Sequence, residues 1–155
     1  RTLRGKTTVR TDPSEEVSVG GSRVVRSSDE DEIAIVACGI TVGEAADAAE
    51  QLERDGVRAR VIDCYSVKPI DADALTAAAT EVQAILTVED HWLEGGLGEA
   101  VASALADQPD RPPIIRLAVR EMPVSGTPAE LLRAAGIDAQ SIVDAVRAQV
   151  GSAAR

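Results

Sequence analysis

The chain has 155 residues and a mass of 16.1 kDa, which is enough for one compact domain and too little for two. Its 45% hydrophobic and 27% charged residues are typical of a globular protein, and no apolar run approaches the roughly 18 residues that a membrane-spanning helix needs. A net charge of -10 argues against nucleic-acid binding, which depends on a basic face that meets phosphates.

The core must be built almost without aromatic side chains, because Tyr65 and Trp92 are the only Phe, Tyr or Trp residues. A core of Ala, Val, Ile and Leu suits helices that pack closely on a parallel sheet. The two cysteines do not make a disulfide framework, so a reduced, cytoplasmic setting fits best. Residue 1 is Arg and no signal-peptide pattern follows, so we expect a piece of a longer protein or a processed product.

Residues 1–32 differ in composition from the rest, being rich in Arg, Thr, Ser, Asp and Glu. Valines on both sides of Gly20-Gly21 predict a hairpin or an edge strand, and an antiparallel edge strand is expected at residues 22–26. Residues 27–32 form an acidic connector. We interpret residues 1–32 as the tail of a preceding domain together with a linker.

Four short apolar runs predict buried strands of a parallel sheet, and helix signals lie between them. The strands are expected at residues 33–38, 58–64, 82–88 and 114–119. A first helix is predicted from the capping-box spacing of Thr41 and Glu44, and it ends at Gly56. Further helices are predicted from Asp71 to about Ala79, from about Leu97 to Ala106, from Thr127 to Gly136 and from Asp138 to Val150.

This alternation of strands and helices predicts an α/β fold, with a mostly parallel open sheet that is covered by helices on both faces. The domain is expected at residues 33–150, followed by a short C-terminal tail at residues 151–155. The sequence contains no internal repeat that would indicate a solenoid.

A glycine-rich turn, Gly96-Leu97-Gly98, precedes a predicted helix and invites a dinucleotide-binding interpretation. The pattern fits poorly, because Val101 stands where the third glycine belongs and the turn starts well after the predicted strand end at Val88. No acid follows at the position that ribose binding requires. We therefore favour a tight turn that lets the helix pack close to the sheet.

The segment Glu89-Asp90-His91 combines two carboxylates with the only imidazole of the chain at a predicted strand end. Open α/β sheets place their ligand sites at such ends. His91 could act as a general acid or base, but a metal site would need more converging ligands. Because one histidine without a nearby nucleophile is a thin catalytic set, we favour an interface or loop-backbone role for His91 and Trp92.

Two further groups have a chemical and a simpler interpretation. Cys38 and Cys64 both fall at predicted strand ends, but the Cys-x-x-Cys spacing of redox pairs is absent, so we favour two small buried hydrophobic residues. Residues 1–6 hold three basic side chains that could bind a phosphate. Composition alone favours a solvated polar tail for them.

Three separated motifs point to a family. Residues 85–101, ILTVEDHWLEGGLGEAV, closely resemble the signature loop in the C-terminal domain of transketolase. Residues 61–63 and 67–71 resemble the strand and loop that precede it, and residues 123–132 and 136–138 resemble the family's C-terminal end. The motifs follow the family's order across essentially the whole chain, and the similarity is closest to the shorter, animal-like transketolases.

The resemblance implies the C-terminal portion of an enzyme of the pentose phosphate pathway, which transfers a two-carbon ketol unit from a ketose phosphate to an aldose phosphate. It also implies thiamine diphosphate and a divalent metal, Mg or Ca, as cofactors. The family's Gly-Asp-Gly cofactor motif, activating glutamate and substrate-handling histidines are missing from this sequence. We therefore expect an inactive chain with no catalytic, cofactor-binding or metal-binding residue of its own.

The start of the chain gains a meaning from the same resemblance. Residues 1–4 resemble the end of the family's pyrimidine-binding domain, and Arg4 matches the arginine that contacts the substrate phosphate. Family members are dimers, so the resemblance implies sugar-phosphate substrates and either a homodimer or a partner subunit that carries the cofactor domain.

Alternatives to an ordinary transketolase stay open. One is a non-catalytic dimerisation or docking subunit of a split transketolase. Another is the equivalent domain of a deoxyxylulose-phosphate synthase or of a 2-oxoacid dehydrogenase β-subunit. The Glu89-Asp90-His91 loop followed by Glu94-Gly95-Gly96 favours transketolase over these last two.

Overall fold

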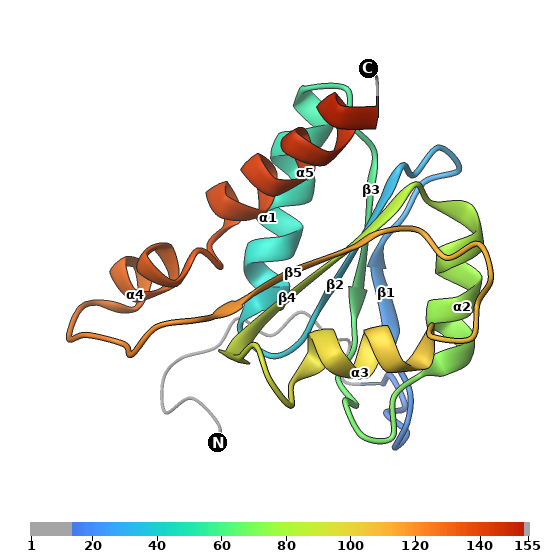
Figure 1. Ribbon diagram of the computed structural model, residues 1–155, viewed down its shortest axis with the longest axis horizontal. Helices are drawn as coiled ribbons and strands as arrows, with labels where there is room; N and C mark the ends of the chain where they lie inside the picture. Colours follow the sequence, from blue (N-terminus) through green and yellow to red (C-terminus); the bar gives the residue numbers. More distant parts are fainter. Residues whose placement is uncertain (1–13, 154–155) are drawn as a thin grey trace.

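Runs of small and branched apolar residues form a five-stranded sheet in the described part of the chain (Figure 1). This computed structural model describes the backbone of residues 14–153 and the side chains of residues 14–150. β1 pairs antiparallel with β3, and the other neighbouring strands are parallel. The spatial order is β1-β3-β2-β4-β5, with β1 (Arg23–Arg26), β2 (Ile33–Ala37), β3 (Ala59–Asp63), β4 (Ala84–Trp92) and β5 (Ile114–Val119).

Helices cover both faces of the sheet (Figure 1). α1 (Thr41–Arg54) and α5 (Ala139–Ala153) pack on one face, and α2 (Ala72–Glu81) and α3 (Leu97–Ala104) pack on the other. α4 (Pro128–Ala135) extends from one side of the molecule and has no buried residue. Within residues 14–153, none of these helices is long and apolar enough to cross a membrane.

The predicted fold class is confirmed, including the antiparallel edge strand, which forms at Arg23–Arg26. Residues 14–19 form no strand, so β1 is an edge strand and not half of a hairpin. Two predicted helix starts are also confirmed. The Asp71 side chain accepts a hydrogen bond from the Ala74 N–H, and Thr127 forms the predicted capping box of α4.

The predicted capping box of α1 is wrong. Ile40 is the N-cap residue, and its side chain makes no capping bond. Thr41 is fully buried, and its hydroxyl lies 2.9 Å from two carbonyl oxygens, one of them that of Val88 in β4. Glu44 accepts a hydrogen bond from the Ala139 N–H, 2.8 Å away at the start of α5. Tertiary contacts therefore use both side chains that local spacing assigns to the cap.

β4 is longer than its apolar run predicts. The sequence places its end at Val88, whereas the strand continues to Trp92, which pairs with Val119 of β5. The register is irregular between Val88 and Trp92. A neighbouring strand supplies backbone partners whatever the side chains are, so the polar segment Glu89-Asp90-His91 also keeps strand geometry.

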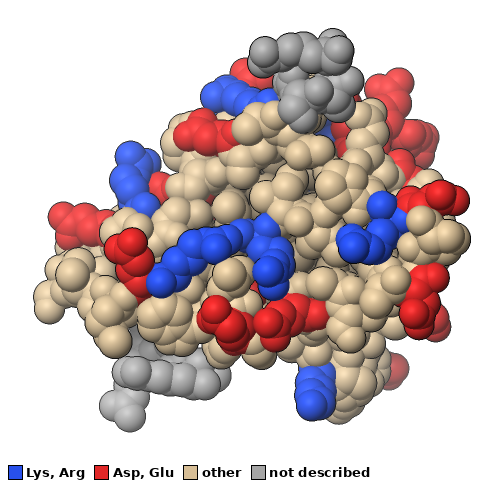
Figure 2. Space-filling model, viewed as in Figure 1, with Lys and Arg blue, Asp and Glu red and all other residues tan. Residues whose placement is uncertain are grey.

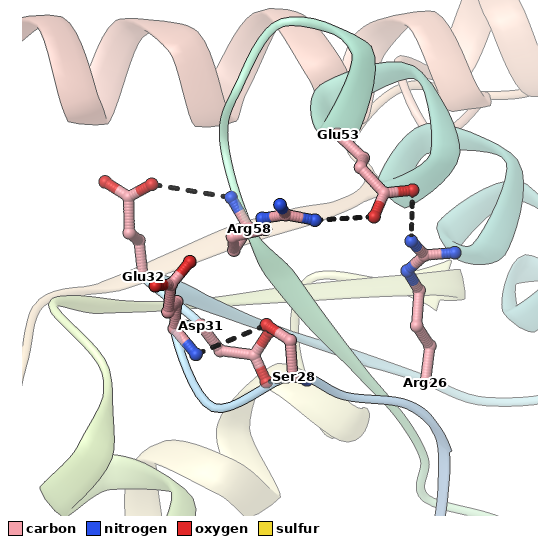
Figure 3. A network of polar contacts seen from close by, with 7 residues as sticks. Arg26, Ser28, Asp31, Glu32, Glu53 and Arg58 are labelled. Carbon is pink, nitrogen blue, oxygen red and sulfur yellow. Dashed lines mark hydrogen bonds and ion pairs between the residues drawn. The ribbon is translucent and has the colours of Figure 1, made fainter.

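Charged side chains close the amino ends of the parallel strands (Figure 3). The Glu53 carboxylate near the end of α1 accepts hydrogen bonds from Arg26 at 2.5 Å and from Arg58 at 2.6 Å. The Asp31 side chain, 3% exposed, accepts bonds from the Ser28 N–H and hydroxyl and from an arginine of β3. These contacts hold the loops that lead into β2 and β3.

Candidate functional site

The opposite ends of the parallel strands bring together the residues that the sequence singles out. Cys38 follows β2, Cys64 follows β3, and Glu89-Asp90-His91 lies in the last part of β4. β2 and β4 are neighbours, while the helices that follow them lie on opposite faces of the sheet. Ligands of open α/β sheets bind at such a point. We call these strand ends and their loops, residues 38–40, 64–71, 89–96 and 119–127, the carboxyl edge.

Glu89 is the centre of the carboxyl edge, and only 1% of its surface is exposed. Its two oxygens accept hydrogen bonds from the N–H groups of Leu97 at 2.6 Å and Gly98 at 2.8 Å, in the first turn of α3. These N–H groups have no partner within the helix, and the helix dipole favours a negative charge there. Glu89 therefore caps α3 from the neighbouring strand, and the two bonds offset the cost of burying its charge.

The two glycines before α3 make room for this cap. Gly95 has a φ of 74°, in the left-handed region that favours glycine. A Cβ atom at Gly96 would overlap the Glu89 carboxylate. Glu99 closes the turn by accepting a hydrogen bond from the Gly95 N–H at 2.8 Å. The Gly-Gly pair is therefore needed both for the turn and for the close approach of Glu89.

This geometry excludes the dinucleotide interpretation of the glycine-rich turn. In nucleotide-binding folds the N-terminus of the helix is open to the pyrophosphate. Here the Glu89 carboxylate occupies that position. The predicted tight turn is confirmed, because a Cβ atom at Gly98 would lie 3.0 Å from the Thr87 hydroxyl and 2.8 Å from the Arg116 side chain. Within the described residues, no three His, Cys, Asp or Glu side chains are grouped so that they could hold a metal ion.

Asp90 and His91 are exposed on the last part of β4, and Trp92 beside them is 41% exposed. The His91 Nδ1 atom lies 2.9 Å from the Trp92 carbonyl oxygen, which is a hydrogen-bond distance when Nδ1 carries the proton. This contact supports the loop-backbone role for His91. The contact uses only the backbone of Trp92, whose ring remains at the surface.

The two cysteines lie at the ends of neighbouring strands, because Ala37 and Asp63 directly before them are paired. Burial raises the pKa of the Cys38 thiol to about 12, and the negative charge of Glu89 acts in the same direction. Burial also raises the pKa of Cys64 to about 11. Cys64 is buried as predicted, whereas Cys38 is only half-buried. Reactive cysteines have lowered pKa values, so both thiols suit the role of small hydrophobic residues better than a redox pair.

A contact that the sequence does not predict holds the Gly20-Gly21 turn against the carboxyl edge. The Gly20 N–H donates to the Ser66 hydroxyl at 2.9 Å, and that hydroxyl donates to the Pro69 carbonyl oxygen at 2.6 Å. A Cβ atom at Gly21 would overlap the Tyr65 hydroxyl. The Gly-Gly pair is the only sequence signal for this contact. The segment before β1 is therefore tied to the loop after β3.

A hollow of about 470 Å³ lies between α1, α4 and α5. Its acidic side chains already have partners, because Glu44 bonds to the start of α5, Glu130 caps α4, and Asp138 accepts bonds from Ser141. Burial acts to raise the pKa of Asp138, but the Ser141 hydrogen bonds and the charge of Arg133 outweigh it, and the pKa lies below its usual value. This hollow is a seam between helices whose polar groups are satisfied.

Arg4, the predicted substrate-phosphate ligand, lies outside the described residues, as does the whole basic cluster of residues 1–6. On the face drawn in Figure 2, one short band of basic side chains crosses the middle, and acidic side chains border it. That face therefore lacks the broad positive field of a nucleic-acid interface.

Comparison with known proteins identifies the family. A family model described as "Transketolase, C-terminal domain" matches residues 22–142. Mouse transketolase is 41% identical over 151 residues, which are 97% of this chain and 24% of that protein. Mouse transketolase-like protein 2 is 45% identical over 150 residues, covering 95% of this chain and 23% of that protein. Human transketolase is 40% identical over 154 residues, covering 99% of this chain and 25% of that protein.

Solved structures agree with this. A structure described as "Split gene transketolase, inactive beta4 tetramer" has a TM-score of 0.82 and 35% identity, over 93% of this chain and 46% of that chain. Transketolase from Campylobacter jejuni has a TM-score of 0.62 at 15% identity, over 89% of this chain and 20% of that chain, which is a likeness of fold. This chain spans about a quarter of the length of the curated relatives named above. The resemblance drawn from the three motifs is confirmed, and the chain belongs to the transketolase C-terminal domain family.

Proposed function

We propose that this chain is the C-terminal portion of a transketolase, which transfers a two-carbon ketol unit from a ketose phosphate to an aldose phosphate. The observation that supports this most directly is the identity of 40%, 41% and 45% to three proteins named transketolase or transketolase-like, each over at least 95% of this chain. The chain by itself is proposed to be inactive, because it corresponds to about a quarter of those proteins.

Thiamine diphosphate and a divalent metal, Mg or Ca, are the proposed cofactors of the complete enzyme. The described residues do not fit a diphosphate at α3, because Glu89 already accepts the N–H groups that would bind it. They also offer no group of three or more metal-binding side chains. The cofactor site is therefore assigned to segments outside this chain, on the same polypeptide or on a partner subunit.

Within the chain we assign residues 1–32 to the tail of the pyrimidine-binding domain and a linker, residues 33–150 to the C-terminal α/β domain, and residues 151–155 to a tail. The family match begins at residue 22, and β1 pairs with β3. The last part of the linker thus supplies an edge strand to the domain. Because β1 is paired in the sheet, we propose that the segment before β1 meets the domain from a fixed direction.

A non-catalytic docking subunit of a split transketolase is the second candidate. The observation that favours it is the similarity to a structure described as an inactive β4 tetramer of a split-gene transketolase. In both candidates we propose sugar-phosphate substrates and a cytoplasmic setting. They differ in assembly, since a continuous polypeptide would form a homodimer whereas a split enzyme needs a partner subunit that carries the cofactor domain. The coding sequence upstream of Arg1 distinguishes the two.

The proposed reaction is tested by assaying this chain and the complete enzyme side by side. Each receives thiamine diphosphate, Mg²⁺, a ketose phosphate and an aldose phosphate. We expect ketol transfer by the complete enzyme and none above background by the chain. Turnover by the chain alone would contradict its assignment as the portion without the cofactor site. A cofactor-loaded complete enzyme that transfers no ketol unit would contradict the transketolase assignment.

Arg4 is proposed to bind the substrate phosphate in that enzyme. A guanidinium presents a planar fork of donors that matches two phosphate oxygens. Arg4→Ala is expected to raise KM for phosphorylated sugars more than it lowers kcat, with a loss of roughly ten- to a hundredfold in kcat/KM. Arg4→Lys should recover part of this, because it keeps the charge and loses the fork. Hydroxypyruvate, a donor without a phosphate, should keep its KM; equal impairment of both donors would indicate a structural role.

A further inference from the structure

Three of the large exposed hydrophobic side chains lie in the carboxyl edge, and two more lie in the segment before β1 that is tied to it. Six such side chains occur in the described part of the chain. Five of them lie at the ends of β4 and β5 or in the segment tied to the loop after β3, namely Trp92 (41% exposed), Met122 (79%), Val124 (72%), Val17 (67%) and Val19 (87%). Single exposed apolar side chains are ordinary, but several on one edge mark an interaction surface.

No other part of residues 14–150 covers these side chains. Residues 121–130 are all exposed, and Figure 1 shows this stretch extending from the end of β5 to α4 at the side of the molecule. The amino ends of the same strands differ, because the network around Glu53 and Asp31 closes them (Figure 3). Among the described residues, none of the exposed large hydrophobic side chains lies in the loops at the amino ends.

The part of the surface around Trp92 is also preformed. Trp92 is fixed by its pairing with Val119, and the loop that follows it is held by the Glu89 cap on α3. A surface that is already ordered loses little conformational entropy on binding. Charged side chains of both signs flank the apolar ones in sequence, because Asp90, Glu94 and Glu121 are exposed and so is Arg120. An apolar patch with a rim of mixed charge would complement this surface.

We propose that the carboxyl edge is the surface on which the cofactor-carrying part of the enzyme packs, with Trp92, Met122 and Val124 at the contact. This inference rests on the proposed function. The matched relatives are about four times as long as this chain, so most of such a protein lies outside it. The Gly20 contact with Ser66 holds the segment before β1 at this same edge, and the remainder of a continuous polypeptide would be joined to that segment.

Hydroxyl-radical footprinting of the complete enzyme tests the proposal. Trp92 and Met122 are the only Trp and Met of the chain, and both side chains are readily oxidised. Their oxidation rates are measured by mass spectrometry in the native enzyme and in the same enzyme unfolded in urea. An uncovered Met122, 79% exposed, would react at close to the unfolded rate. We expect native rates that are slower by roughly fivefold or more, because the core of an interface excludes solvent.

Two matched substitutions locate the contact. Val124→Glu places a charge in the proposed contact and should bring Trp92 and Met122 oxidation back toward the unfolded rate. Val24→Glu is the control, because Val24 is exposed on β1, which β3 and β2 separate from β4, and the substitution should leave the protection unchanged. Protection that survives Val124→Glu would overturn the proposal.

The remaining outcomes are also decisive. Equal native and unfolded oxidation rates would overturn the proposal. Protection that appears only as enzyme concentration rises would identify a second copy as the occupant and would overturn it as well. If the enzyme transfers ketol units but Trp92 and Met122 are not protected from oxidation, the proposed docking surface is wrong and the proposed function stands. If the two side chains are protected but the enzyme transfers no ketol unit, the docking surface stands and the proposed function is wrong.

Discussion

The amino and carboxyl ends of the parallel strands use charge differently. At the amino ends, Glu53 pairs with Arg26 and Arg58 near the surface, with 42% of the Glu53 and Arg58 side chains exposed. At the carboxyl ends, Glu89 is buried and binds backbone N–H groups of α3. An exposed ion pair contributes about 0–1 kcal/mol to stability. Removing a buried acceptor costs more, about 1–3 kcal/mol, because its donors are left without a hydrogen bond.

This contrast teaches that burial, more than the number of charged partners, decides which polar contacts contribute most to the free energy of unfolding. The amino end has more ion pairs, yet most of its charges remain hydrated. At the carboxyl end, the position of the loop at Gly95-Gly96 depends on the buried Glu89 carboxylate. We therefore expect the buried contacts at Glu89 to stabilise the fold more than the exposed ion pairs at the amino end. The following substitutions test this ranking, starting with the largest expected effect.

Glu89→Ala should have the largest effect. It leaves the N–H groups of Leu97 and Gly98 without an acceptor, and we expect a loss of about 2–4 kcal/mol in the free energy of unfolding. Urea denaturation measures this. The matched control is Glu99→Ala, which removes an exposed carboxylate that accepts one N–H bond in the same loop and should cost less than about 1 kcal/mol. Equal losses from the two substitutions would contradict the ranking.

Gly96→Ala should follow, because the new Cβ overlaps the Glu89 carboxylate. We expect a loss of about 1–3 kcal/mol from the forced displacement. Gly126→Ala is the control, since its Cβ would meet neighbours at an ordinary 3.4 Å. In a Glu89→Ala background, Gly96→Ala should cost less than it does alone, because the closest overlapping group is gone and only the His91 ring, 2.9 Å from the new Cβ, remains. Additive losses would show that Gly96 is restricted for another reason.

Asp31→Ala should have an intermediate effect at the amino end. Its side chain is 3% exposed and accepts bonds from Ser28 and Arg60, so we expect a loss of about 1–2 kcal/mol. Arg58→Ala should cost less than about 0.5 kcal/mol, and its effect should shrink in high salt. Thermal or urea unfolding at two salt concentrations separates the two. An Arg58→Ala loss as large as that of Glu89→Ala would overturn the comparison.

Ionisation of the cysteine thiols should have the smallest effect on the free energy of unfolding at neutral pH. Because burial raises the pKa of Cys38 to about 12 from an ordinary 9.0, its thiol ionises more readily in the unfolded chain than in the folded one. The corresponding stability is fully present below pH 9 and is lost as the pH rises toward 12. Iodoacetamide labelling at pH 7.5 should be slower in the native chain than in the unfolded chain by on the order of a hundredfold. Equal labelling rates would contradict the burial of this thiol.

The sequence by itself determined the sheet and its helical layers, because their signals are local. The run at 114–119 coincides with β5, and the run at 33–38 contains β2. The Thr127 capping box lies in a loop where no other element competes for the hydroxyl, and it forms as predicted. The same spacing at Thr41 fails, because this residue is buried against β4 and bonds there instead.

Only the tertiary structure decided the chemistry of the carboxyl edge. Sequence placed Glu89 at a strand end, but its burial depends on the N–H groups that α3 brings to it. The Gly20-Gly21 turn meets Ser66 across 46 residues, and no local pattern encodes that distance. Burying a carboxylate is favourable only where folding delivers its partners, so the role of Glu89 follows from packing and not from its position in the sequence.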